Sequence, residues 1–299
     1  MTNGKAELSD GDSTCANLLE IATWSRQSLM SGLAEEKLRA REQWGQDPCG
    51  AEMAREHELG TREFFDAVER NRYTDYAPWM PRLMGFDQFA GASLLEIGCG
   101  MGSDLLQFAR GGALCTGVDL TPRSVEITRH RFALYGLAGS FVISDGESLP
   151  FKANSFDVVY SNGVLHHTPD TQRAIDEVHR VLRPGGTAKV MLYHRNSLNY
   201  WMEIVLRRGI LGAEYLRGRS SEEIMSRVIE FSDHEARPLV KVYTRGQARE
   251  LFRQFKEVSV DVEQLTRAEL RFLSPLVSAS LFTRLAHKIG WNVIITAVK

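Results

Sequence analysis

A glycine-rich segment is the first set of residues whose types and spacing could bind a ligand. Residues 94–102 read LLEIGCGMG, an apolar run followed by three glycines at alternate positions. Glycine lets the backbone approach a ligand closely, and a helix that begins after such a turn offers free N–H groups to an anionic group. The segment therefore predicts a nucleotide-like ligand. The dinucleotide fingerprint G-x-G-x-x-G/A fits poorly, because Ser103 stands at its last position.

Two carboxylates follow where a nucleoside would need them. Asp119 ends an apolar run about twenty residues after Gly98, where a carboxylate can accept hydrogen bonds from both hydroxyls of a ribose. Asp145, with Gly146 and Glu147 behind it, follows the next apolar run and could receive an adenine amino group. Asp145 could equally cap its own loop as an Asx turn. The second carboxylate separates this pattern from a nicotinamide site.

His167 is the first candidate for a general base. It lies in the segment HHTPD after a fourth apolar run, and ligands of open α/β sheets bind at the carboxyl ends of the strands. A base within reach of a reacting hydroxyl or amine contributes about a hundredfold in rate. Tyr193 and His194 end the fifth run on the same rim, and Tyr200 and Trp201 follow, which predicts an aromatic, partly apolar pocket. A structural role for His167, and a core role for the rings, are the alternatives.

The elements that must position these residues follow the rhythm of a parallel sheet covered on both faces. Strands are expected at 93–97, 115–119, 140–144, 156–161 and 187–193. Helices are expected at 103–110, from Thr121 and Pro122 to Gly136, and from Thr168 and Pro169 through Val181, ahead of a turn at 184–186. Thr244 and Gln247 have capping-box spacing for a helix through Phe255, and strands at 258–262 and 291–299 follow.

Two segments depart from this rhythm. Residues 1–79 are expected to form a charged N-terminal helical cap punctuated by Gly45, Gly50 and Gly60, with 1–13 disordered. Residues 194–243 are expected to form a helical insertion, far longer than the usual connection of about two to six residues. The cofactor-binding core then occupies 80–193, and 244–299 complete its sheet around a second helical insertion. Insertions of this size usually build a lid or a substrate pocket.

Composition excludes several classes of protein. A chain of 299 residues with 43% hydrophobic residues can bury a full core, and a net charge of -2 with interspersed signs does not favour a nucleic-acid partner. No apolar run approaches the roughly 18 residues needed to span a bilayer, so no stable membrane insertion is expected. Residues 201–216 mix apolar side chains with Arg207 and Arg208, which suits a packed cap helix better than an amphipathic surface helix.

The cysteines and histidines do not suggest a metal. Four widely spaced cysteines match neither a metal motif nor a disulfide framework, and they predict reduced thiols in a cytoplasmic protein. The remaining histidines, including His234 beside Glu235, lack metal-ligand spacing, so no metal ion is expected.

The motifs, in order and spacing, resemble those of class I S-adenosylmethionine-dependent methyltransferases. The resemblance rests on 96–102, 117–119, 145–151, 156–167 and 181–186. It is closest to the branch with ubiquinone/menaquinone-type and natural-product enzymes that act on small molecules. It implies an α/β, doubly wound, Rossmann-like sheet of seven strands with an antiparallel terminal hairpin. The cap and the insertion after Tyr193 are not part of the minimal fold, so the identity of the substrate does not carry over.

The resemblance also implies S-adenosyl-L-methionine as cofactor and assigns residues around it. Those around its methionyl group and ribose would be Glu96, Gly98, Gly100, Gly102, Asp119 and Leu120, and those around adenine Asp145, Gly146 and Glu147. Asn162 and Val164 would line the cofactor near its sulfonium. Tyr73, ahead of Trp79, resembles a tyrosine that closes over the cofactor, although a core position would suit it equally.

The implied activity is methyl transfer to oxygen, nitrogen or carbon of a small, partly apolar metabolite. A sulfonium is a strong electrophile, so the protein must chiefly align a nucleophile and exclude water, with His167 and Tyr193 as the catalytic candidates. Hydride transfer with a nicotinamide cofactor is disfavoured by Ser103 and Asp145. Binding without catalysis is disfavoured by the polar rim that includes His194. A small-molecule acceptor is the expected partner, and the oligomeric state stays open, with a homodimer among the alternatives.

Overall fold

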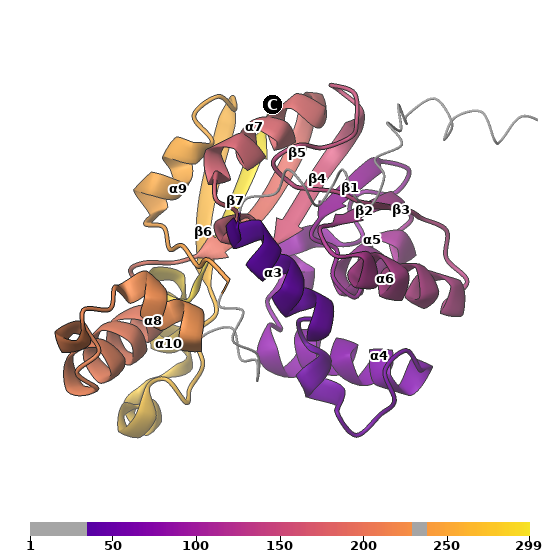
Figure 1. Ribbon diagram of the computed structural model, residues 1–299. Coiled ribbons are helices and arrows are strands. Elements are labelled where there is room, and N and C mark those ends of the chain that lie inside the picture. The colour runs from indigo at the N-terminus through magenta and orange to yellow at the C-terminus, as the bar shows by residue number, and fades with distance from the viewer. Residues whose placement is uncertain (1–34, 229–237) are drawn as a thin grey trace, which may run out of the picture.

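The computed structural model describes residues 35–228 and 238–299. Within these residues seven strands form one mixed sheet in the order β3-β2-β1-β4-β5-β7-β6 (Figure 1). The parallel strands are β1 (Ser93–Ile97), β2 (Leu114–Asp119), β3 (Ser140–Ile143), β4 (Phe156–Asn162) and β5 (Leu182–Tyr193). β7 (Asn292–Val298) runs antiparallel to β5 and to β6 (Glu257–Glu263). The predicted doubly wound sheet with a reversed terminal hairpin is confirmed.

The strand that differs most from its prediction is β5. It begins at Leu182 rather than at residue 187, because Leu182 pairs with Phe156 before the ladder shifts register and resumes between Val158 and Thr187. The expected turn at 184–186 is therefore an irregularity within the strand, and Gly185 adopts a φ of 79° there. The carboxyl end of β5 still falls at Tyr193.

The helices of the core follow their local signals in most places. α5 (Ser103–Arg110) and α6 (Pro122–Leu134) begin as predicted, with the Thr121 hydroxyl accepting a hydrogen bond from the Ser124 N–H. α9 (Arg245–Leu251) has the predicted capping box but ends before Phe255. α7 (Thr171–Val181) does not begin at Thr168, because residues 165–167 form a separate 3-10 turn and the Asp170 side chain caps the helix instead.

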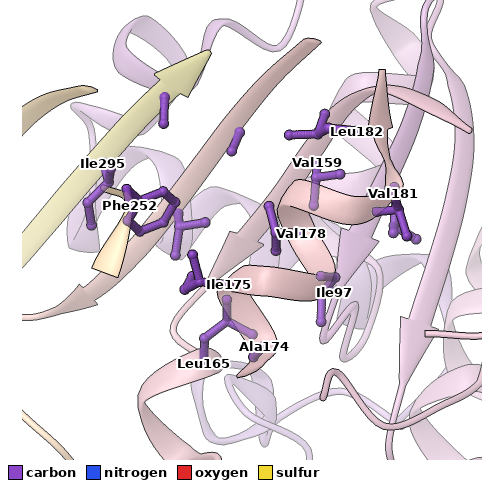
Figure 2. Close-up of a cluster of buried hydrophobic side chains, with 14 of the residues drawn as sticks. Ile97, Val159, Leu165, Ala174, Ile175, Val178, Val181, Leu182, Phe252 and Ile295 are labelled. Atoms are coloured by element: carbon purple, nitrogen blue, oxygen red, sulfur yellow. The ribbon is translucent and has the colours of Figure 1, made fainter. Parts of the chain in front are cut away.

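The two faces of the sheet are buried by different helices. α5 and α6 contribute Leu105, Phe108 and Phe132 to one apolar cluster. α7 contributes Ile175 and Val178 to the cluster on the opposite face, α9 contributes Ala248, and Phe252 directly after α9 joins them (Figure 2). Since successive strand residues point to opposite faces, Leu94 packs in the first cluster and Leu95 in the second.

The remaining helices lie outside this sandwich. The N-terminal part contains α3 (Glu35–Gln46), a 3-10 turn at 51–54 and α4 (Arg62–Arg70), and in Figure 1 α3 crosses in front of the sheet. Gly45 does not end a helix as expected, because it lies inside α3. Gly50 and Gly60 lie between helices and have positive φ angles. The expected disorder of 1–13 and the rest of the cap before residue 35 lie outside the described residues.

Two insertions complete the fold. After β5 come a helix with i→i+5 winding (Tyr200–Leu211), a 3-10 turn (Tyr215–Arg217) and α8 (Ser221–Val228). Between β6 and β7 come a 3-10 helix (Arg271–Leu276) and α10 (Ala279–Ile289). His234 and Glu235, at which no metal ion was expected, lie outside the described residues.

Candidate functional site

A cavity of about 860 Å³ opens at the carboxyl ends of β1, β2, β4 and β5. β1 and β4 are neighbours in the sheet but not in the chain, and such a switch in strand order is where open α/β sheets bind ligands. The predicted site residues that line the cavity are Glu96, Gly98, Gly100, Asp119, Leu120, Asp145, Gly146, Asn162, Val164, His167 and Tyr193. Tyr73, Gly102 and Glu147 are not among the residues that line it.

The glycine loop is fixed by its own backbone. The N–H groups of Gly98 and Cys99 both donate to the Val118 carbonyl oxygen, at 2.8 and 3.0 Å. Gly98 has a φ of 76°, and a Cβ placed on it would lie 2.3 Å from Cγ2 of Val164, so the loops after β1 and β4 meet only because residue 98 is glycine. At Gly100 no described atom lies within 4 Å of such a Cβ. Gly100 therefore faces the cavity, where a ligand can approach the backbone.

A buried carboxylate, Asp104, lies just after this loop and also lines the cavity. Asp104 of α5 accepts two hydrogen bonds of 2.7 Å from the Arg72 guanidinium, one of 2.6 Å from the Tyr73 hydroxyl and one of 2.8 Å from the Tyr160 hydroxyl. Burial alone would raise the pKa of Asp104, but the Arg72 charge and these donors outweigh it and lower the pKa. The hydroxyl of Tyr73 is therefore directed to Asp104, while its ring packs in the core against Phe86.

The cavity wall holds two buried acceptors without partners. Oε2 of Glu96 and Oδ1 of Asn162 have no hydrogen-bond partner among the described residues. Burial, with Asp104 and Asp119 nearby, raises the pKa of Glu96 well above its ordinary value. Buried acceptors are normally satisfied, so these two atoms fit a ligand that brings hydrogen-bond donors, as the ammonium of a methionyl group would. This wall thus suits the predicted cofactor.

Asp119 holds the loop as well as facing the cavity. Its Oδ2 accepts the Gly100 N–H at 3.0 Å, and its Oδ1 accepts both the N–H and the hydroxyl of Thr121 at 2.9 Å. Burial raises the pKa of Asp119, and these donors, with the Ser124 hydroxyl, oppose that rise. An ionised carboxylate offers about four acceptor positions, so a ribose would have to replace a hydroxyl donor to bind both of its own hydroxyls here.

Lys37, a residue that the sequence did not single out, lies over the expected adenine position. Its ammonium is 2.6 Å from Oδ2 of Asp145 and 2.6 Å from Oε2 of Glu147. Burial would lower the pKa of Lys37, but the two carboxylates raise it. Oδ1 of Asp145 also accepts the Glu147 N–H, so the predicted Asx alternative is present, although Asp145 lines the cavity too.

An aromatic row forms the other side of the cavity. Ring centroids are 4.7 Å apart between Trp44 and His167, 4.1 Å between His167 and His166, 3.9 Å between His166 and Tyr193, and 4.7 Å between Tyr193 and Trp291. Nδ1 of His167 lies 2.7 Å from the Leu239 carbonyl oxygen, which fixes the ring. Burial lowers the pKa of His166 well below its ordinary value, so this ring is neutral packing.

The predicted aromatic entrance is only partly correct. His194 does not lie on the rim, because it is buried with Nδ1 3.0 Å from the Gly290 carbonyl oxygen. Tyr200 packs in the insertion's own core with Ile204 and Trp291, as the alternative held, and Trp201 is exposed. The far wall of the cavity comes instead from the insertion and from the loop after β6, through Asn199, Glu203, Ile204, Arg207, Arg208, Gln264, Thr266 and Glu269.

Two further features of residues 35–228 and 238–299 concern metal ions and membranes. No group of three or more His, Cys, Asp or Glu side chains is placed to hold a metal ion there. None of the helices in those ranges is long and apolar enough to cross a membrane. The buried cysteines Cys99 and Cys115 are free thiols.

The fold and the cavity together define a doubly wound cofactor-binding protein, and comparison with known proteins identifies the domain. Residues 95–190 match the family model described as a methyltransferase domain, which confirms the resemblance drawn from the motifs. Two solved structures share the fold. A SAM-dependent methyltransferase from Methanosarcina mazei has a TM-score of 0.51 at 22% identity over 73% of this chain and 96% of its own. The cyclase SpnF has 0.54 at 20% identity, over 89% and 97%.

Two curated relatives are named as methyltransferases. The phthiotriol/phenolphthiotriol dimycocerosates methyltransferase of Mycobacterium tuberculosis is 33% identical over 182 residues, which cover 59% of this chain and 64% of that protein. The sterol 4-C-methyltransferase strm-1 of Caenorhabditis elegans is 38% identical over 94 residues, 31% of this chain and 28% of that protein. This chain thus spans less than two thirds of the length of either relative.

Proposed function

We propose that this chain transfers a methyl group from S-adenosyl-L-methionine to a small lipid-like molecule. The observation that carries the proposal is a single cavity with two unlike ends. One end has the glycine loop and the unpartnered acceptors of Glu96 and Asn162, and the other has the aromatic row. The relatives named above act on a sterol and on phthiotriol dimycocerosates, which supports an acceptor with a large apolar body.

Each predicted cofactor residue has a role in this proposal. Gly98, Gly100 and Gly102 shape the loop around the methionyl group, Glu96 accepts from its ammonium, and Asn162 and Val164 flank the sulfonium. Asp119 and Leu120 receive the ribose, for which Thr121 or Ser124 gives up its contact with the carboxylate. Asp145 and Gly146 meet the adenine, and Glu147 orients Asp145 from behind. Tyr73 acts through Asp104 and does not touch the cofactor.

The bound cofactor supplies a methyl group on an electrophilic sulfonium. The chain must then align the acceptor atom, exclude water and, for a hydroxyl, remove a proton. The contact between His167 and the Leu239 carbonyl makes Nδ1 the protonated nitrogen of the neutral ring, so the ring takes up a proton at Nε2. The aromatic row positions an apolar acceptor beside this ring, and Tyr193 is the second group close enough to orient it.

The test compares Asp119→Ala with Asp157→Ala. Asp157 lies on β4 outside the cavity and pairs with Arg183, so it is a control for a lost carboxylate. Titration with S-adenosylhomocysteine should show at least about tenfold weaker binding for Asp119→Ala, because charged hydrogen bonds contribute about 1.5–3 kcal/mol, and no change for Asp157→Ala. Unchanged affinity in Asp119→Ala would contradict the assigned site.

Methyl transfer itself needs a second measurement, because SpnF shares the fold and is described as a cyclase. Lipid extracts incubated with the protein and deuterated-methyl cofactor should contain species that gain the mass of the labelled methyl. Cofactor binding without any such species, across polar and apolar extracts, would exclude the proposed activity and favour binding without catalysis. The nicotinamide-dependent alternative is not favoured by any of the comparisons.

The expected surroundings of the protein complete the proposal. We propose a cytoplasmic enzyme that acts on a small molecule and does not bind nucleic acid. The interspersed charges of the sequence and the free thiols of Cys99 and Cys115 support this view. A homodimer is a further proposal, and sedimentation of the purified protein tests it.

A further inference from the structure

The helix Tyr200–Leu211 has one buried and one exposed apolar face. Tyr200, Ile204 and Gly209 are buried, at spacings of four and five residues. Trp201, Leu206 and Leu211 follow one another at spacings of five, and Met202, Leu206 and Ile210 at spacings of four, and all of them are exposed. In a helix with i→i+5 winding, residues four and five apart share a face. The exposed apolar residues therefore form one stripe, which we call the docking face.

The docking face is too apolar for an ordinary solvated surface. Trp201 is 52% exposed and Leu211 73%, and Leu216, just beyond the helix, is 89% exposed. Single exposed apolar residues are normal on soluble proteins, whereas a contiguous stripe marks an interaction site. Tryptophan and leucine flanked by arginine is the composition of helices that lie in the plane of a bilayer surface.

The net charge around the docking face indicates what kind of surface it binds. Residues 200–219 carry four arginines against two glutamates, a net charge of +2 in a chain whose net charge is -2. Arg207 and Arg208 share Glu203, and Arg217 and Arg219 share Glu214. Basic residues beside an apolar face attract anionic lipid headgroups. A symmetric dimer through the same face would bring the two sets of arginines together, which opposes a second copy as the occupant.

The same helix forms part of the cavity wall. Glu203, Ile204, Arg207 and Arg208 line the cavity, whereas Trp201 and Leu211 do not. A bilayer in contact with the docking face would thus lie next to the acceptor end of the cavity. We propose that the docking face binds the surface of an anionic lipid bilayer and that a lipid acceptor passes from there into the cavity. The second part rests on the proposed function, and the first does not.

Vesicle flotation of the full chain tests the binding. The probes are phosphatidylcholine vesicles with and without phosphatidylglycerol, and the variant is Trp201→Glu/Leu211→Glu. The matched control is Leu114→Glu, because Leu114 is 63% exposed at the amino end of β2, away from the cavity. The wild type should float with anionic vesicles and release at high salt, and the double variant should bind at least about tenfold more weakly. The control should bind like the wild type.

Three results would overturn the proposal. The first is a wild-type protein that does not float with anionic vesicles, and the second is a double variant that floats as well as the wild type. The third is a wild-type protein that sediments as a dimer and a double variant that sediments as a monomer, with neither protein bound to vesicles. The last result would make the face an interface between copies. Titration of the same variants with S-adenosylhomocysteine separates the two proposals, because neither substituted residue lines the cavity. Vesicle binding without cofactor binding would leave the docking face intact and refute only the proposed function.

Discussion

The two ends of the cavity are built in different ways. The cofactor end consists of loops that directly follow consecutive strands, and backbone hydrogen bonds such as those from Gly98 and Cys99 to Val118 hold it. The acceptor end is assembled from α3, the insertion after β5, the loop after β6 and Trp291 directly before β7. Ring contacts such as that between Trp44 and His167 hold it together. The first end is specified locally and the second by long-range packing. Substitutions at the cofactor end should change the affinity for the cofactor. Substitutions at the acceptor end should change the rate of methyl transfer or the rate at which the cofactor dissociates.

The largest effect is expected at Gly98. Gly98→Ala should weaken S-adenosylhomocysteine binding by about a hundredfold or more, because the new Cβ lies 2.3 Å from Val164 and overpacking of this kind costs about 1–3 kcal/mol before positive-φ strain is added. Calorimetric titration measures the loss. Gly136→Ala is the control, since it has a φ of 68° at the end of α6 with no described atom within 4 Å of the new Cβ. If Gly98→Ala binds S-adenosylhomocysteine as tightly as Gly136→Ala does, the close approach of the two loops is not required for cofactor binding.

At the acceptor end, His167→Ala should lower the single-turnover rate with a hydroxyl acceptor by about a hundredfold. Cofactor affinity should stay within about twofold, because the ring belongs to the other end of the cavity. Quenched-flow assays across a pH series measure both quantities. His57→Ala, on an exposed histidine of the N-terminal region, serves as control. Equal rates for His167→Ala and the wild type at every pH would leave His167 with a structural role only.

Lys37 links the two ends, and Lys37→Met tests whether α3 retains the cofactor. The methionine keeps an apolar stem and loses the ammonium that bridges Asp145 and Glu147, so α3 is held less tightly. The dissociation rate of S-adenosylhomocysteine should rise about tenfold, in line with charged hydrogen bonds of about 1.5–3 kcal/mol. Stopped-flow displacement measures it. Arg39→Met, on the exposed side of the same helix, should leave the dissociation rate unchanged. An unchanged rate in Lys37→Met would show that α3 does not retain the cofactor.

The smallest effect is expected at Glu96, where stability and binding should move in opposite directions. The folded protein raises the pKa of Glu96 well above 4.5, so the wild type loses stability as pH rises above that value. Glu96→Gln has no such loss. It should be about 1 kcal/mol more stable at neutral pH, with the gain vanishing near pH 4, yet bind the cofactor less tightly. Urea unfolding at several pH values measures the stability, and a variant less stable at neutral pH would refute the argument.

The cofactor end could be predicted because its signals are local. Three glycines after an apolar run, the Thr121 cap and the Thr244 capping box each act within a few residues, and the structure has each of them. Where two nearby residues could each cap a helix, the predicted start was wrong. The cap of α7 is Asp170 and not Thr168. The alternation of strands and helices likewise predicted the parallel part of the sheet.

The acceptor end could not be predicted because its contacts join distant residues. Lys37 contacts Asp145 across 108 positions, and nothing in the sequence of a charged helix distinguishes Lys37 from the basic residues Arg39 and Arg41 nearby. Trp44 and Trp291 reach the aromatic row from opposite ends of the chain. The position of His194 directly after β5 predicted a residue on the rim of the cavity. The side chains at the end of a strand can point toward the cavity or into the core, and His194 points into the core because its ring contacts the Gly290 carbonyl oxygen.

The hydrogen bonds to Asp104 have a consequence for how the molecule unfolds. Arg72 and Tyr73 belong to the N-terminal region, whereas Asp104 and Tyr160 belong to the sheet and its helix. Withdrawing Arg72 would leave a buried carboxylate without its counter-charge, at a cost of about 3–5 kcal/mol. That is a large share of the global stability of an ordinary domain. The segment around Arg72 and the sheet should therefore melt in one cooperative transition, and their amide protons should exchange with similar free energies.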